Sequence, residues 1–222
     1  MSKILISGYY GFANAGDEAM LTAIIESLRQ VEKNVELTVL SGNPEDTAAK
    51  HQVCSVYRFN PLGIIRAMKD SELIISGGGS LLQDVTSKRS LLYYLSIIGL
   101  GKFFGKKVML FAQGIGPIRA KWARKLTSLV CNEADLITVR DSESAAELIE
   151  MGVKPEKITV TADSVLSLNP VTKECGQYLL QEAGVDLTKP VIGISVRPWS
   201  GDSQCFQVLA EAASKLQQSY GA

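Results

Sequence analysis

Glycines, an amide and two carboxylates gather in the stretch SGYYGFANAGDEAML, at residues 7–21. The glycines allow a tight turn with positive φ, and amides at the start of the helical pattern that follows can receive an anion or a hydroxyl-rich ligand. We therefore expect a ligand loop that includes Asn14, Gly16 and Asp17. A structural alternative stays open, because Asn14 can cap the helix and Asp17 in its first turn favours the helix dipole. The stretch matches neither GxGxxG nor a P-loop, so it predicts neither nicotinamide nor ATP binding.

A second glycine-rich stretch, SGGGSLLQD at residues 76–84, also follows a strand-like run. The lack of side chains at Gly78 and Gly79 leaves backbone amides available as a cradle for an anion or a sugar. A tight strand-to-helix turn explains the glycines equally well, but Gln83 and Asp84 add a polar end that a turn does not need. We expect all four residues to bind substrate.

Three further strand ends carry polar residues that suit a substrate. Gln113, in AQGIGP, offers an amide donor and acceptor beside a glycine turn. Arg140, in TVRDSES, suits a phosphate or carboxylate bound through two hydrogen bonds, or an ion pair with Asp141 or Asp163. Asp163 either faces a cleft or caps the next turn. Arg197 ends a later strand and is expected to face the same cleft from the other side.

Composition disfavours several classes of function. The 222 residues carry 23 basic and 23 acidic side chains, so bulk charge attracts neither nucleic acid nor an anionic membrane. The four cysteines form no CxxC pair, which disfavours zinc and a disulfide framework and indicates reduced thiols. The single histidine, His51, lies in a polar stretch where we expect solvent exposure, so no histidine is predicted as a general acid or base. We expect no metal and no cofactor.

Short apolar runs alternate with helical patterns along most of the chain. The predicted strands are KILIS, VELTVLS, ELIISGG, KVMLFAQ, LITVR and KITVTA, at residues 3–7, 35–41, 72–78, 107–113, 136–140 and 157–162. Helical periodicity marks residues 20–28, 121–134 and 142–152, the last with Ser142 as its cap. Strands with helices between them predict an α/β fold with a doubly wound parallel sheet, in which all strands end at one edge.

The pattern changes after Asp163. We expect a Rossmann-like amino-terminal domain over residues 1–166, an interdomain connection with one helix over 167–190, and the start of a second α/β domain over 191–222. In the last part, VIGISVRPW predicts a buried strand and SQCFQVLAEAASKLQQSYG a helix. These two elements cannot bury their apolar faces alone, so this part either packs on the first domain or begins a longer protein, and we favour the longer protein.

The longest uncharged run, SLLYYLSIIGLG at residues 90–101, is too short to span a bilayer. Basic residues on both sides allow a helix that lies against a membrane surface, but a buried helix with basic ends is the favoured interpretation. The start of the chain lacks the pattern of an export signal. We therefore expect a cytoplasmic protein, with peripheral contact at the inner membrane face left open.

Five motifs in order resemble a single family. GYYGFANAGDEAML, ELIISGGGSLLQD, MLFAQGIGP, ITVRDSES and VTADSVL, which lie within residues 4–166, are similar to the polysaccharide pyruvyltransferase family. The closest resemblance is to the branch that pyruvylates secondary cell wall polymers for S-layer anchoring. The resemblance implies a GT-B-like architecture of two facing α/β domains with the active site between them.

The resemblance also implies a chemistry. The donor is phosphoenolpyruvate, a co-substrate, and the acceptor is an N-acetylmannosamine residue of a lipid-linked cell wall precursor, which becomes a 4,6-linked pyruvate ketal. On that chemistry Arg140 and Arg197 suit the donor's phosphate and carboxylate, and Asp17 serves as a hydroxyl-activating base or an acceptor anchor. The other expected hydroxyl partners are Asn14, Gln83, Asp84 and Gln113. The general acid is expected in a second domain that is mostly absent from this chain.

Two other functions stay open. A GT-B glycosyltransferase that uses a nucleotide sugar would also place its cleft between two such domains. A non-catalytic sugar-binding module is the alternative of a different class, since only the start of a second domain is expected here.

Overall fold

A computed structural model of the chain describes residues 2–196 and 203–221. The chain divides into two units, residues 1–168 and 169–222. The first unit contains the sheet, and each unit is described by itself.

Seven parallel strands form one sheet in the order β3-β2-β1-β4-β5-β6-β7. The strands are β1 (Lys3–Tyr10), β2 (Glu36–Ser41), β3 (Cys54–Tyr57), β4 (Leu73–Gly77), β5 (Lys107–Gln113), β6 (Leu136–Val139) and β7 (Ile158–Val160). The six strands expected from the sequence are present, whereas β3 was not expected. Since β3 is an edge strand with no fully buried residue, it needs no apolar run and leaves no strand pattern.

Six α-helices and two 3₁₀ helices connect and follow these strands. They are α1 (Ala15–Val31), α2 (Pro44–His51), α3 (Pro61–Asp70), α4 (Lys88–Phe103), α5 (Lys121–Glu133), α6 (Ser142–Glu150), η1 (Pro155–Lys157) and η2 (Ser164–Ser167). The expected helices correspond to α1, α5 and α6. The expected Ser142 cap is wrong, because Asp141 caps α6 by accepting a hydrogen bond from the Ser144 N–H at 2.7 Å.

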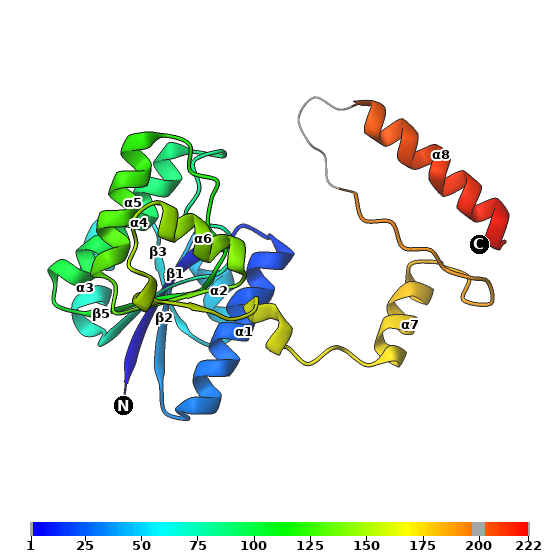
Figure 1. The fold of residues 1–222 in the computed structure, drawn as a ribbon. Helices are drawn as coiled ribbons and strands as arrows, with labels where there is room; N and C mark the ends of the chain where they lie inside the picture. Colours follow the sequence, from blue (N-terminus) through cyan, green and yellow to red (C-terminus); the bar gives the residue numbers. More distant parts are fainter. Residues whose placement is uncertain (1, 197–202, 222) are drawn as a thin grey trace. The chain divides into compact units, whose positions relative to one another are not determined.

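Helices cover both faces of the sheet, as a doubly wound fold requires (Figure 1). Successive strand residues point to opposite faces. Ile4 and Ile6 belong to a core cluster with Leu21 and Ile24 of α1, whereas Leu5 belongs to the larger cluster that includes residues of α3, α4, α5 and α6. The predicted α/β fold with a doubly wound parallel sheet is confirmed.

The strand order reverses between β1 and β4, which are hydrogen-bonded neighbours although two strands separate them along the chain. A doubly wound sheet leaves a crevice at the carboxyl ends of the two strands that flank such a switch point, because their connections leave in opposite directions. The loops after β1 and β4 are the two glycine-rich stretches of the sequence. The fold therefore places both stretches at the switch point of the sheet.

Helix α4 holds the uncharged run between its basic ends. Six of its residues are buried in the core, namely Leu91, Tyr94, Leu95, Ile97, Ile98 and Gly101. This burial agrees with the favoured buried-helix interpretation. Among the residues that the structure describes, no helix is both long and apolar enough to cross a bilayer.

The second unit contains two helices, α7 (Lys173–Glu182) and α8 (Ser203–Tyr220), in its described part. Both correspond to expected helices. The strand expected from Val191 is not formed over residues 191–196, and the rest of that segment lies outside the described residues. A strand needs a neighbour for its backbone N–H and C=O groups, and the described part of this unit supplies none.

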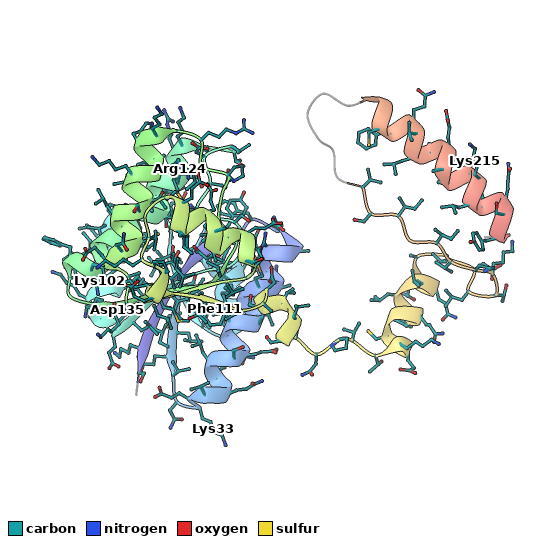
Figure 2. All side chains as sticks on the ribbon, viewed as in Figure 1. Lys33, Lys102, Phe111, Arg124, Asp135 and Lys215 are labelled. Carbon is teal, nitrogen blue, oxygen red and sulfur yellow. The ribbon has the colours of Figure 1, made fainter. Side chains whose placement is uncertain are left out.

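The amino edge of the sheet, opposite the glycine loops, is held by a carboxylate. Asp135 lies just before β6, and Figure 2 labels it beside Lys102. Its carboxylate accepts hydrogen bonds from Lys102 Nζ at 2.6 Å, Lys107 Nζ at 3.2 Å and the Val108 N–H at 2.8 Å. Partial burial raises the pKa of Asp135, but the hydrogen bonds from Lys102, Val108 and Lys107 outweigh it and lower the pKa to about 2. The ionised carboxylate thus joins α4, β5 and the start of β6.

Replacement of this carboxylate should destabilise the fold in a pH-dependent way. Asp135→Asn is expected to lower the free energy of unfolding by about 2 kcal/mol at pH 7, measured by urea denaturation. Because the folded pKa lies below the unfolded value, the contribution of Asp135 is fully present above about pH 4 and fades as the pH falls through about 2. Glu133→Gln, which changes an exposed carboxylate nearby, is the control. Equal stabilities of Asp135→Asn and the parent chain at pH 7 would contradict this account.

Candidate functional site

The loop after β1 is held by the first turn of α1. Asn14 caps the helix, and its Oδ1 accepts hydrogen bonds from the Gly16 N–H at 3.1 Å and the Asp17 N–H at 3.4 Å. Gly11 has a φ of 77° and donates its N–H to Glu18 Oε1 at 2.8 Å. The first amides of α1 therefore have partners within the loop, and Asn14 acts as a cap.

Glu18 also contacts the histidine of the chain. His51 Nε2 lies 3.2 Å from Glu18 Oε2, and the His51 side chain is only 9% exposed. The expectation of an exposed histidine is wrong, because His51 ends α2, which packs beside β2 and brings the ring against α1. Glu18 thus links α2 to the Gly11 loop.

Asp17 lies at the centre of the switch point. A Cβ atom on Gly79 would lie 2.9 Å from Asp17 Oδ1, so this glycine lets the carboxylate approach the loop after β4. Within the described part of the chain, no donor forms a hydrogen bond to the Asp17 carboxylate. Burial, and secondarily the charge of Glu18, raise the pKa of Asp17 to about 6. An unpartnered carboxyl with a raised pKa at the switch point of the sheet is suited to accept a proton.

The loop after β4 is shaped by two glycines with positive φ, 87° at Gly78 and 62° at Gly79. Tyr10, the last residue of β1, donates its hydroxyl to the Gly77 carbonyl at 2.6 Å, and a Cβ on Gly78 would lie 2.7 Å from the Tyr10 hydroxyl. The Gly79 N–H points to Met20 Sδ at 3.0 Å. A weak acceptor such as a thioether leaves this N–H poorly satisfied, which is compatible with the expected cradle.

Arg140 lies on the other side of the same loop. Its Nη2 donates a hydrogen bond to Ser80 Oγ at 3.3 Å. Its Nε donates to the Asp141 carboxylate and its Nη1 to the Asp163 carboxylate, each also at 3.3 Å. The guanidinium packs against Gly114, where a Cβ would lie 2.7 Å from it. Both ion pairs considered from the sequence are present, and Arg140 remains 35% exposed beside the loop.

Gln113 forms a buried polar layer behind the site. It is fully buried, and its Nε2 donates to Ser76 Oγ at 2.9 Å. Its Oε1 has no partner within the described residues. The buried hydroxyl of Ser7, the residue of β1 that pairs with Ser76 of β4, also has no partner there. The Gln113 carbonyl accepts the Arg140 N–H at 3.2 Å, so this residue supports Arg140 from behind.

Three expected substrate-binding residues make local hydrogen bonds. Gln83 is bonded to Thr86 through its Nε2 and Oε1, and Asp84 accepts from the backbone N–H groups of Arg119 and Ala120 before α5. Hydrogen bonding to the Arg119 N–H lowers the pKa of Asp84. Asp163 caps η2 through the Val165 N–H at 3.1 Å, in addition to its contact with Arg140. Arg197 lies outside the described residues.

The structure thus places Asp17 and Arg140 beside the loop after β4, which contains Gly78 and Gly79. Gln113 is buried behind this loop. Gln83 and Asp84 lie further along the chain, toward α4. Sequence reasoning missed Tyr10 and Arg58. Tyr10 carried a signal in the nearby glycines, Gly8 and Gly11, and Arg58 in its position between two aromatic residues, Tyr57 and Phe59. No group of three or more metal-ligating side chains occurs within the described residues.

A doubly wound parallel sheet with its polar residues at the switch point defines the Rossmann-like class of ligand-binding domains. A model of the family "Polysaccharide pyruvyl transferase" matches residues 14–203, and the chain belongs to this family. A comparison with curated proteins gave no match.

Several solved structures share the fold. HepE from Anabaena in complex with UDP-glucose is 15% identical with a TM-score of 0.59, over 95% of this chain and 58% of that one. The UDP-GlcNAc 2-epimerase of Neisseria meningitidis bound to UDP-GlcNAc is 13% identical with a TM-score of 0.60, over 100% and 64%. A glycosyltransferase from Rickettsia africae is 14% identical with a TM-score of 0.58, over 98% and 58%.

These structures are of GT-B type, so the GT-B-like fold class expected from the sequence is confirmed. The chain spans between 58% and 64% of their length.

The raised pKa of Asp17 can be measured directly. In a ¹³C NMR titration of side-chain carboxyls, Asp17 should titrate near pH 6, because burial disfavours its charged form. Glu18→Gln should lower that midpoint, since it removes the second cause of the shift. Glu26→Gln, an exposed change on the same helix, should leave it unchanged. A midpoint near 4 in the parent chain would show that Asp17 is freely solvated.

Proposed function

We propose that this chain provides the acceptor side of a pyruvyltransferase that uses phosphoenolpyruvate. Family membership supports transfer of a pyruvyl group in general. The observation that carries the proposal is Asp17, a carboxylate without a hydrogen-bond donor in the described part of the chain, with a raised pKa, set against Gly79 at the switch point. The proposed acceptor is an N-acetylmannosamine residue of a lipid-linked cell wall precursor, and the product is its 4,6-linked pyruvate ketal.

The proposed reaction needs an acid and a base but no change of oxidation state of the enzyme. A proton is added to C3 of phosphoenolpyruvate, which makes C2 cationic. One sugar hydroxyl adds to C2 and loses its proton, and phosphate leaves with the electron pair of its bond to C2. The second hydroxyl then closes the ketal and loses its proton. Of the two hydroxyl protons, one balances the proton gained by C3 and the other leaves with the phosphate.

Asp17 is proposed as the base for a sugar hydroxyl, or as its anchor. With a pKa of about 6, the carboxyl is mostly ionised at neutral pH but is a better proton acceptor than an ordinary aspartate. Arg140 is proposed to bind the phosphate or carboxylate of the donor, where it would exchange part of its contact with Asp141 or Asp163 for the ligand. The same proposal includes Arg197 on the donor side and peripheral contact with the inner membrane face, where a lipid-linked acceptor resides.

The test measures phosphate release from phosphoenolpyruvate together with ketal formation by mass spectrometry. An acceptor analogue that contains N-acetylmannosamine is supplied to the chain and to the full product of the reading frame that contains it. In whichever form is active, Asp17→Asn should lower kcat about 100-fold, and kcat/KM of the parent should rise through about pH 6 as Asp17 ionises. Asp70→Asn, an exposed carboxylate at the end of α3, is the control. Unchanged turnover of Asp17→Asn would remove Asp17 from the mechanism.

A nucleotide-sugar glycosyltransferase is the second candidate, since the solved structures of similar fold include a glycosyltransferase and complexes with UDP-sugars. Release of UDP from a UDP-sugar, with no phosphate release from phosphoenolpyruvate, would favour it. Binding of the acceptor without either reaction would favour a sugar-binding module.

A further inference from the structure

Arg58 is a buried cation at the carboxyl edge of the sheet that the proposed mechanism does not use. It follows β3 directly, and only 5% of it is exposed. Aromatic rings surround its guanidinium carbon. The distances to the ring centroids are 4.4 Å for Tyr93, 5.1 Å for Phe59, 5.3 Å for Phe12 and 5.5 Å for Tyr94. We call these residues and Arg58 the aromatic cage.

The charge of Arg58 is not neutralised by a side chain. Within the described residues, no carboxylate forms an ion pair with it, and its side-chain hydrogen bond is a long one, from Nη1 to the Tyr94 hydroxyl at 3.4 Å. Its Nε is buried without a partner in that part of the chain, and so is the Tyr93 hydroxyl. Ring faces offset only part of the cost of removing a guanidinium from water, and buried charges are ordinarily paired. The aromatic cage therefore contains a buried guanidinium nitrogen, Nε, and a buried hydroxyl, that of Tyr93, which have no hydrogen-bond partner within the described residues.

An exposed aromatic surface lies over this cation. Tyr9 and Phe12 stack with centroids 4.3 Å apart and planes 14° apart, and they are 40% and 42% exposed. Phe59, whose ring centroid is 5.1 Å from the guanidinium carbon, is 62% exposed. Large apolar side chains that remain exposed together mark a contact surface, and flat rings suit the C–H face of a sugar. Phe12 belongs to the same loop as Asn14, at the start of the helix that carries Asp17.

We propose that the aromatic cage binds a phosphate group of the sugar acceptor. This inference rests on the proposed function, because the lipid-linked acceptor of that function would carry its sugar on a phosphate. The oxyanion accepts hydrogen bonds from Arg58 and from the Tyr93 hydroxyl, while the sugar stacks on Tyr9 and Phe12 and extends toward Asp17. Phe12, whose ring centroid is 5.3 Å from the Arg58 guanidinium carbon, lies two residues before Asn14, the cap of the helix that carries Asp17, and this connects the cage to the proposed reaction centre.

The strand order favours the acceptor over phosphoenolpyruvate as the source of this phosphate. Arg58 follows β3 and Arg140 follows β6, and these strands are five positions apart in the sheet. At about 4.8 Å between neighbouring strands, this separation is on the order of 24 Å between the strand axes. Arg58 reaches toward α4, and Arg140 toward the loop after β4. Two cations so far apart suit two different ligands better than the two ends of one three-carbon donor. Arg140 is the cation beside the loop after β4, where Gly79 meets Asp17.

The test compares Arg58→Met with the parent chain by isothermal titration calorimetry. The probes are a short-chain alkyl diphosphate ester of an N-acetylmannosamine-containing disaccharide, the neutral alkyl glycoside of the same disaccharide, and phosphoenolpyruvate. The parent should bind the diphosphate ester at least 10-fold more tightly than the neutral glycoside. Arg58→Met should abolish that difference and leave affinity for phosphoenolpyruvate unchanged. Arg66→Met, which removes an exposed arginine from α3, should behave as the parent.

Stability separates this role from a structural one. Methionine keeps the apolar contacts of the cage, and replacement of an unpaired buried charge by an apolar side chain is often neutral or stabilising. Arg58→Met should therefore unfold at the same or a higher urea concentration than the parent. Arg58→Lys, which retains the charge, should recover part of the preference for the diphosphate ester.

Three results would overturn the proposal. The first is equal binding of the diphosphate ester by Arg58→Met and the parent. The second is loss of phosphoenolpyruvate binding alone, which would assign the cage to the donor. The third is a large loss of stability without a change in binding, which would make Arg58 structural. Pyruvate transfer is measured separately. If binding depends on Arg58 but no ketal forms, only the proposed function is rejected. If ketal forms equally well with Arg58→Met, only this binding site is rejected.

Discussion

The hydrogen bond from the Tyr10 hydroxyl to the Gly77 carbonyl joins the ends of β1 and β4 at the point where the strand order reverses. The buried ring can lie there because Gly8 and Gly78 have no side chains that would occupy its place. The two loops that follow these strands are thereby held next to each other, and the carboxylate of Asp17 meets Gly79. Glycine at these positions therefore has a packing reason, the close approach of two loops, besides any contact with a ligand.

The carboxyl edge has an uneven distribution of charge. Arg140 shares its positive charge with two carboxylates, so a ligand there competes with existing partners. Arg58 has aromatic rings and a single long side-chain hydrogen bond within the described residues, so an anion there would replace nothing of similar strength. Asp17 carries a carboxyl that burial makes easier to protonate. The edge thus contains two cationic positions of different character on either side of the Asp17 carboxyl.

Several polar residues at this edge serve the fold. Asn14 caps α1, Gln83 closes a turn with Thr86, and Asp84 satisfies two backbone N–H groups ahead of α5. Glycine-rich loops leave many backbone groups without regular partners, so nearby polar side chains are used to satisfy them. A polar residue at a strand end is therefore evidence of a ligand only when its own hydrogen bonds remain unsatisfied, as those of Asp17 do within the described chain.

The sequence by itself determined the alternation of strands and helices, six of the seven strands, and the gathering of polar residues at strand ends, because apolar periodicity and glycine punctuation are local properties. It did not reveal β3, whose edge position requires no apolar run, and it predicted a strand at Val191 that residues 191–196 do not form. Only the tertiary structure decided which polar groups are already paired, that His51 lies against Glu18, and that rings of α4 and two loops enclose Arg58. The physical reason is that burial and pairing depend on neighbours distant in the chain, and those neighbours are chosen by the order of the strands.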